Sequence, residues 1–169
     1  DKSLTLEGEE RDTTIIDGTG IDAHYGIHVT ADGVTIRNFT IQGFTYGWGW
    51  GVQLTGADSC HLENLLIKDC NNGRNLYEDS DSNFVENCEI VDIGGNAISI
   101  YGSDVGCRDN VIRNNRIIGC AWYMPEGEYH LPAIPVFSGA TYNLIEGNVL
   151  EGKGVGHGIA LWGYTYGGE

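Results

Sequence analysis

A motif of eight residues that returns four more times constrains the fold of this chain more than any other feature. Its copies occupy residues 34–41, 60–67, 83–90, 110–117 and 143–150. Aligned with one another, the copies give two apolar columns, which are Ile36, Leu62, Val85, Ile112 and Ile145, and Ile41, Ile67, Ile90, Ile117 and Leu150. Self-similarity of this kind is typical of a solenoid, because each repeat buries its apolar face only against its neighbours.

Six short segments with alternating apolar and polar residues lie between and around these copies, at residues 26–29, 51–54, 75–78, 97–100, 133–136 and 158–161. This alternation predicts strands, and every predicted inward position is apolar except Glu78. The first apolar residues of the segments are separated by steps of 25, 24, 22, 36 and 25, so the long step predicts an inserted loop near residues 120–132. We therefore predict an all-β fold, a right-handed parallel β-helix of about six rungs that forms a single domain over residues 1–169.

Asparagines recur between the two apolar columns of the motif. They are Asn38, Asn64, Asn87 and Asn114, and Gly147 takes this place in the last copy. In a parallel β-helix, equivalent residues stack about 4.8 Å apart, so their side-chain amides can hydrogen-bond up and down the stack. The sequence therefore predicts an inward, structural ladder of asparagines.

Two segments resemble the repeats of other β-helix proteins. The opening segment Lys2-Ser-Leu-Thr-Leu-Glu-Gly-Glu, continued by Asp12-Thr-Thr-Ile-Ile-Asp-Gly18, is similar to the first rung of NosD-type and pectate-lyase-like repeat proteins. The segment Gly33-Val-Thr-Ile-Arg-Asn-Phe-Thr-Ile-Gln-Gly43 resembles their repeat consensus. The resemblance covers nearly the whole chain and implies the β-helix fold. It implies no single activity, since that superfamily includes lyases, hydrolases, epimerases, adhesins and surface scaffolds.

The charge and composition of the chain limit its partners. A formal net charge of −15 makes nucleic acid and anionic membrane surfaces unfavourable partners. No apolar run approaches the roughly 18 residues that a membrane span needs, so we expect no membrane insertion. Cys70 and Cys120 share a column, but at two rungs' separation their Cα atoms would lie about 9.6 Å apart, too far for a disulfide. We expect buried free thiols instead.

Two loops that lead into the alternating segments are rich in aromatic residues. They span residues 43–51 and 121–130, and their aromatic residues include Tyr46, Trp48, Trp50, Trp122, Tyr123 and Tyr129. Flat, exposed rings of this kind can stack on sugar rings, so we expect carbohydrate binding here. The alternative is that these rings pack on one another and shield the flank of the helix.

A second group of residues offers a catalytic alternative. Tyr77, Glu78 and Asp79 lie on or beside the outer face of the alternating strands, with His28 two rungs away. Paired carboxylates serve as acid and base in glycoside hydrolysis, and a tyrosine with a histidine can abstract a proton beside a uronate carboxyl. An inward Glu78 means either a desolvated carboxyl with a raised pKa or a local slip of the strand.

The resemblance implies that a lyase of this class would carry a lysine or arginine base on the same face. The outward positions predicted from the alternation hold neither residue. We therefore assign no catalytic residue. A polysaccharide lyase or glycoside hydrolase acting on an acidic polysaccharide stays as the alternative function.

Aspartates recur in the turn that follows the alternating strands. They are Asp32, Asp58, Asp81 and Asp104. Stacked carboxylates can chelate calcium through their oxygen atoms, but aspartate also caps tight turns by bonding to the backbone. We favour the turn caps. Because the histidines and cysteines show no zinc-ligand spacing, we expect no metal or other cofactor.

The ends of the chain fall between rungs. Residues 1–6 align with the second strand of a rung, and residues 158–169 supply a first strand and its turn. Uncapped strand edges at both ends favour head-to-tail stacking into filaments, although a larger β-helix that continues past both ends explains the pattern equally well. We expect an extracellular or cell-surface structural protein that associates with itself and binds polysaccharide through its aromatic loops.

Overall fold

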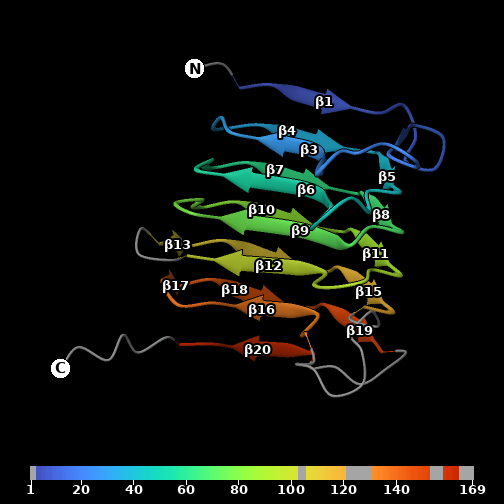
Figure 1. The fold of residues 1–169 in the computed structure, drawn as a ribbon. Coiled ribbons are helices and arrows are strands. Elements are labelled where there is room, and N and C mark those ends of the chain that lie inside the picture. Colours follow the sequence, from blue (N-terminus) through green and yellow to red (C-terminus); the bar gives the residue numbers. More distant parts are fainter. Residues whose placement is uncertain (1–2, 103–105, 121–130, 153–157, 164–169) are drawn as a thin grey trace.

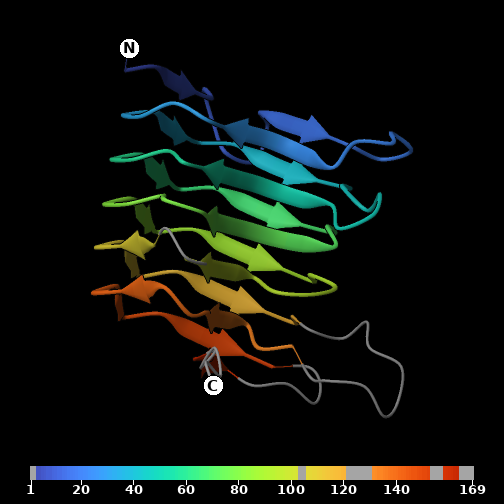
Figure 2. The same ribbon diagram turned by 60° about the vertical axis from the view of Figure 1, so that its left-hand side comes forward.

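The computed structural model describes residues 3–102, 106–120, 131–152 and 158–163. In this part of the chain the regular structure is entirely β, and the strands follow one another in coils stacked along one axis (Figure 1 and Figure 2). The first and last coils lie at opposite ends of the stack (Figure 1). No helix long and apolar enough to cross a membrane occurs among the described residues.

Each coil contributes one strand to each of three parallel sheets. Sheet A contains β1 (Thr5–Glu7), β4 (Thr35–Arg37), β7 (His61–Glu63), β10 (Phe84–Glu86), β14 (Val111–Arg113) and β18 (Leu144–Glu146). Sheet B contains β2 (Ile15–Asp17), β5 (Thr40–Gln42), β8 (Leu66–Lys68), β11 (Glu89–Val91), β15 (Arg116–Ile118) and β19 (Val149–Glu151). Sheet C contains β3 (Tyr25–Val29), β6 (Trp50–Thr55), β9 (Asn72–Tyr77), β12 (Ile98–Tyr101), β16 (Ile134–Val136) and β20 (Ile159–Leu161). A further pair joins β13 (Cys107–Arg108) to β17 (Ala140–Thr141).

This arrangement confirms the predicted all-β parallel β-helix, with six strands in each main sheet of the described chain. The inserted loop predicted near residues 120–132 lies largely outside the described residues. The five cysteines are free, as expected, and four of them are buried.

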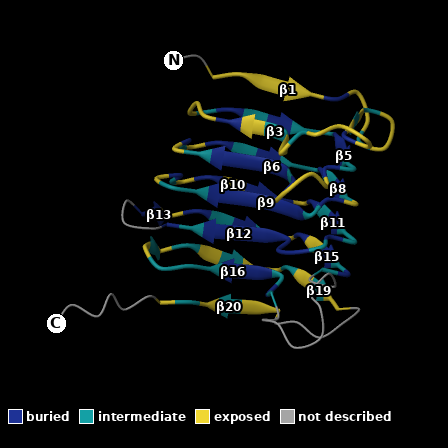
Figure 3. Ribbon diagram, viewed as in Figure 1, coloured by how far each residue is buried: buried dark blue, intermediate teal, exposed yellow. Residues whose placement is uncertain are grey.

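The two apolar columns of the motif form the core side of sheets A and B. In sheet A the register pairs Ile36 with Leu62, Leu62 with Val85, and Val85 with Ile112, and each of these side chains is at most 1% exposed. Sheet B pairs the second column in the same way. Because a fully buried aliphatic side chain contributes roughly 1.5–3 kcal/mol, these columns contribute substantially to stability. Figure 3 shows that burial is greatest in the middle coils.

The third strand of sheet C is shifted from its predicted register. The apolar pattern placed Leu76 beside Val52, but β9 pairs Leu76 with Leu54 and with Ile100. Glu78 consequently lies beyond the end of the strand. Of the two explanations for Glu78, the local slip of the strand is correct and the inward carboxyl is wrong.

Arg74 is the reason why the register of β9 was predicted wrongly. It takes the inward place between Val52 and Ile98, and its side chain is 1% exposed. Its Nε, Nη1 and Nη2 atoms are buried and have no hydrogen-bond partner in the described part of the protein. The prediction depends on an alternation of apolar residues, which a charged residue interrupts. The inward place beside Val52 was therefore assigned to Leu76, two residues after Arg74.

The asparagine column of the motif lies in the turn between sheets A and B, not inside the solenoid. Asn38, Asn64, Asn87 and Asn114 have φ values of 63°, 48°, 54° and 55°, and Gly147 has 63°. Asparagine adopts this left-handed conformation more readily than most residues, which explains why it recurs here. Asn64 Nδ2 donates to Asn38 Oδ1 at 2.9 Å, which is the bond the ladder predicts for this pair. Asn87 and Asn114 are exposed, so their predicted inward placement is wrong.

The buried asparagine ladders occupy other positions. The backbone N–H of Asn83 donates to Asn110 Oδ1 at 2.9 Å, and the N–H of Asn110 donates to Asn143 Oδ1 at 2.9 Å. A second ladder continues this pattern, because the N–H of Asn115 donates to Asn148 Oδ1 at 2.9 Å. Each bond satisfies a backbone group that the turn would otherwise leave unpaired, and it ties one coil to the next.

Candidate functional site

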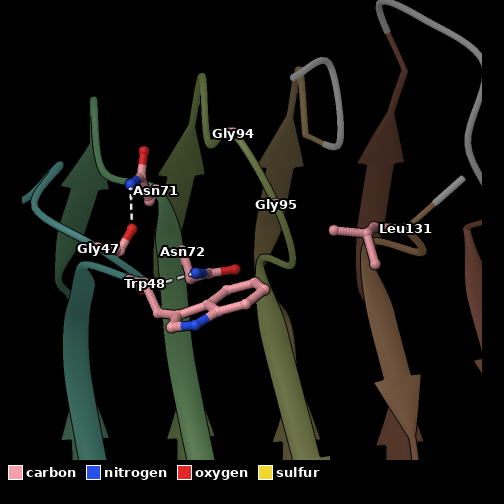
Figure 4. A pocket seen from close by; sticks show the side chains of 7 residues that line it. All are labelled: Gly47, Trp48, Asn71, Asn72, Gly94, Gly95 and Leu131. Carbon is pink, nitrogen blue, oxygen red and sulfur yellow. Dashed lines mark hydrogen bonds between the residues drawn. The ribbon is translucent and has the colours of Figure 1, made fainter. Parts of the chain in front are cut away.

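A hollow of about 380 Å³ lies on the flank of the solenoid, where the chain passes from sheet B to sheet C. It is lined by Gly47, Trp48, Asn71, Asn72, Gly94, Gly95 and Leu131 (Figure 4). These residues come from the chain between β5 and β6, around the start of β9, before β12 and before β16. The hollow therefore crosses successive coils and runs along the stack.

The loop that carries Trp48 is held in place by the coil that follows it. Asn71 Nδ2 donates to the carbonyl oxygen of Thr45 at 2.8 Å and to that of Gly47 at 2.6 Å. Asn72 Nδ2 donates to the carbonyl oxygen of Trp48 at 2.7 Å. These three bonds fix the backbone on both sides of the indole, so the loop needs little further ordering when a ligand binds.

Three of the lining residues are glycines, so no side chain projects into the hollow from these positions. A Cβ atom at Gly95 would lie 2.4 Å from Asn72 Oδ1, which is closer than such atoms approach one another. Gly47 has a φ of 55°, in the left-handed region that favours glycine. A flat ligand can therefore lie against the backbone beside the Trp48 ring.

The predicted aromatic residues differ in their surroundings. Trp48 is 74% exposed and Tyr46 is 47% exposed, whereas Trp50 is half-buried within β6. Tyr46 packs edge-on against His24, with ring centroids 5.0 Å apart. Trp122, Tyr123 and Tyr129 lie outside the described residues. Tyr46 therefore packs on a histidine and not on another ring of the predicted aromatic loops, while Trp48 presents an open ring.

The sequence identified Trp48 but missed the residues around it. The pair Asn71–Asn72 and the pair Gly94–Gly95 occupy the passage from sheet B to sheet C in successive coils. An alignment of these turns, instead of the strands alone, would have shown that they adjoin the Trp48 loop.

Comparison with known proteins agrees with this architecture. The family described as a right-handed β-helix region matches residues 5–167. The chain belongs to the right-handed β-helix family. Among curated proteins, none matches this β-helix. Family membership defines the fold of this chain but not its ligand.

The catalytic alternative lies on the outer face of sheet C of this β-helix. Asn75, and not Tyr77 as predicted, lies beside Gln53 and Ser99 on the outer face. Tyr77 lies two residues farther along the strand, beside Thr55 and Tyr101. Its ring stacks on Tyr101 with centroids 5.3 Å apart. A hydrogen bond to Glu78 is the main cause that raises the pKa of Tyr77, which makes this tyrosine a poorer base at neutral pH.

Glu78 and Asp79 form a tight turn directly after β9. Their φ values are 39° and 50°, and the residue equivalent to Glu78 one coil earlier is Gly56, with a φ of 54°. A non-glycine residue in this conformation is strained by roughly 1–3 kcal/mol. The same left-handed conformation recurs in other turns, for example at Ser59 and Ser82. His28 lies two coils away, where it hydrogen-bonds to Thr55 Oγ1 at 3.1 Å, so it is not brought to these carboxylates.

The recurrent aspartates in the described part of the β-helix accept hydrogen bonds from the backbone of the next coil. Asp32 Oδ1 accepts the backbone N–H of Asp58 at 2.9 Å, and Asp58 Oδ1 accepts that of Asp81 at 2.8 Å. Asp81 Oδ1 in turn accepts the N–H of Arg108 at 2.6 Å. Asp104 lies outside the described residues, within which no cluster of metal-ligating side chains is found. The bonds therefore join neighbouring coils, whereas the predicted turn caps would bond within their own turn.

Proposed function

We propose that this β-helix binds carbohydrate in the hollow beside Trp48 and acts as a structural protein outside the cell or at its surface. The observation that carries the proposal is an indole that is 74% exposed on a loop held by three side-chain hydrogen bonds. Covering an exposed apolar ring is favourable, and a preformed loop loses little entropy when it binds.

A sugar ring has the chemistry that this hollow accommodates. One face of a pyranose consists largely of C–H groups, which can stack on the flat apolar face of Trp48. Its rim of hydroxyl groups can hydrogen-bond to the neighbouring Asn71 amide. The shallow floor at Gly94 and Gly95 leaves room for the ring to lie flat. Polysaccharide occurs outside cells and at their surface, and from this we infer the location.

Replacing the indole tests the proposal. We expect Trp48→Ala to lower the affinity for the bound glycan at least tenfold, since a central tryptophan in a binding site contributes about 2 kcal/mol or more. The glycan would be found on a glycan array, and its affinity measured by isothermal titration calorimetry. Tyr142→Ala is the matched control, because Tyr142 is 85% exposed and does not line the hollow. Unchanged affinity in Trp48→Ala would rule out this site.

Cleavage of an acidic polysaccharide at the Glu78–Asp79 turn is a second candidate function, favoured by two neighbouring carboxylates of which Glu78 hydrogen-bonds to Tyr77. If it operates, Asp79→Asn should abolish the release of reducing ends from a uronic-acid polymer, and Tyr77→Phe should lower its rate. Circular dichroism would confirm that both variants fold. A parent protein that releases no reducing ends would eliminate this candidate.

A further inference from the structure

We infer that the hollow binds a neutral glycan segment that runs parallel to the solenoid axis, and that it discriminates against chains of uronic acids. The inference rests on the proposed carbohydrate binding and adds the orientation and the charge of the ligand. Three features support it: the length of the hollow, the charge of its loops and the kind of hydrogen-bonding group it offers.

The length of the hollow gives the orientation of the ligand. Its lining residues come from four successive coils, from the Trp48 loop to Leu131. Neighbouring coils lie about 4.8 Å apart, so three steps span about 14 Å along the axis. In Figure 4 the indole of Trp48 extends toward Gly95, and Leu131 lies farther along the same row. One sugar ring fills only part of this length, whereas a short linear segment fills it.

The charge of the loops gives the class of glycan. None of the described lining residues is charged. The three loops that carry Trp48, Asn71 and Gly95 contain two charged residues, Asp69 and Asp92, and both are acidic. Among the described residues a uronate carboxylate would therefore lose hydration without gaining a cationic partner, in a chain that has 24 acidic and 9 basic residues. A neutral sugar avoids this cost.

Arg74 does not supply the missing cation. It follows the lining residue Asn72 by two positions, but its side chain takes an inward place between Val52 and Ile98 and is 1% exposed. A ligand on the flank of the solenoid cannot contact it. The hollow therefore has no described basic side chain that could pair with a carboxylate.

Asn71 supplies the polar contact. Both hydrogen bonds from its Nδ2 go to carbonyl oxygens, those of Thr45 and Gly47, and Figure 4 draws the second. Its Oδ1 is therefore the amide atom that is left to bond to a ligand. An amide oxygen accepts hydrogen bonds but donates none. It pairs with a sugar hydroxyl, which can donate, and repels a carboxylate, which at neutral pH only accepts.

Calorimetric titration with two oligosaccharide series tests the inference. One series consists of neutral hexoses in several linkages and the other of uronic acids, with matched chain lengths, each at low and at high salt. We expect neutral affinity to rise with each added ring until the hollow is filled. At equal length it should exceed uronate affinity at least tenfold and be independent of salt, because no ion pair forms.

Each other outcome has a defined meaning. Uronates that bind as tightly as neutral chains, or a neutral affinity that stops rising after one ring, would overturn the inference while Trp48→Ala still establishes the site. Absence of binding in both series would overturn the inference together with the proposed function.

A variant at the far end of the hollow tests the orientation separately. Leu131 is partly exposed, so Leu131→Arg should fold, and Leu131→Gln is the uncharged control. We expect Leu131→Arg to bind uronate chains at least tenfold more tightly than the parent, in a salt-dependent manner, and Leu131→Gln to leave uronate binding unchanged. If the arginine has no effect on long chains, the ligand does not extend along the axis.

Discussion

Arg74 has the least favourable environment among the described inward residues of sheet C. Its guanidinium is 1% exposed, and all three of its nitrogen atoms are buried with no hydrogen-bond partner in the described structure. A charge buried without a partner costs several kcal/mol. Since its neighbours in the column are Val52 and Ile98, an aliphatic side chain suits this place better.

Replacing this arginine should stabilise the protein. We expect Arg74→Leu to raise the free energy of unfolding by about 1–4 kcal/mol, measured by urea denaturation. Leu76→Arg, which adds a second charge at the next inward place, is the control and should strongly destabilise the protein. A less stable Arg74→Leu would show that the guanidinium makes a favourable interaction that outweighs its burial.

Glu78 carries backbone strain that a glycine would relieve. Its φ of 39° places it in the left-handed region, where the equivalent residue one coil earlier is Gly56. We expect Glu78→Gly to raise the free energy of unfolding by about 1 kcal/mol, and Gly56→Glu to lower it by a similar amount. Thermal melts would measure both. Loss of stability in Glu78→Gly would mean that the hydrogen bond to Tyr77 outweighs the strain.

Glu86 makes stability depend on pH. It is 7% exposed and lies between His61 Nε2, at 2.6 Å, and Arg113 Nε, at 2.5 Å. The bond from Arg113 is the main cause that holds the pKa of Glu86 below its ordinary value of 4.5. The unfolded state therefore takes up the proton first as pH falls. The stabilisation is complete above pH 4.5 and is lost as pH drops through the lower folded pKa.

Removing this carboxylate should make stability depend less on pH in the acidic range. We expect Glu86→Gln to be less stable than the parent at pH 7, and to lose less of its melting temperature between about pH 5 and pH 3. Glu63→Gln is the control, because Glu63 takes the same place one coil earlier and is more exposed. If Glu86→Gln lost as much melting temperature at acidic pH as the parent does, Glu86 would not be the cause of the pH dependence.

At the scale of strands and turns, asparagine has two different roles. Asn110 bridges coils from a buried position, where its Nδ2 donates to the carbonyl oxygen of Ser80 at 2.9 Å and its Oδ1 accepts from Asn83. Asn114 is exposed and supplies a left-handed turn residue with a φ of 55°. The two positions are four residues apart in sequence, yet their substitutions should differ in cost.

Alanine at each position measures this difference. We expect Asn110→Ala to lower the free energy of unfolding by about 2–4 kcal/mol, because buried backbone groups lose their partners. Asn114→Ala should lower it by about 1 kcal/mol, the cost of a left-handed alanine. Both would be read from urea denaturation. Equal losses at the two positions would contradict the separation of a buried ladder from a turn column.

The accuracy of the sequence-based prediction varied from element to element for physical reasons. The columns of sheets A and B could be predicted because every inward place in the repeats holds an aliphatic residue. The register of β9 could not, because Arg74 interrupts the apolar pattern. The site was predicted in part: Trp48 stands out between glycines, whereas the bonds from Asn71 cross between coils and depend on the path of the turns.

At the scale of the whole molecule, inward apolar side chains are exposed in the first and last described coils. Leu6 is 40% exposed, Ile159 is 47% exposed and Leu161 is 77% exposed, while the equivalent residues of the middle coils are buried (Figure 3). A further coil would cover these surfaces, whether it comes from a longer chain or from a second copy. Head-to-tail association of copies stays a prediction.

Electron microscopy tests this association. We expect the purified protein at micromolar concentration to form thin, unbranched filaments, and Leu161→Glu to abolish them, because a charge would replace an apolar contact between copies. Tyr142→Glu places the same charge on the side of the stack and should leave the filaments intact. Discrete particles of the parent protein would contradict end-to-end association.

In the buried asparagine ladders, each backbone N–H donates to a side-chain oxygen of a later coil. The backbone donor belongs to one coil, and the side-chain acceptor follows it by 27 residues for Asn83 and Asn110, and by 33 residues for Asn110 and Asn143. On a ribosome, the acceptor is therefore synthesised after the donor that needs it. We expect a nascent chain to remain protease-sensitive in its newest coil until the next coil has left the exit tunnel, so that folding follows synthesis one coil behind. Proteolysis of chains arrested at successive lengths would reveal this lag.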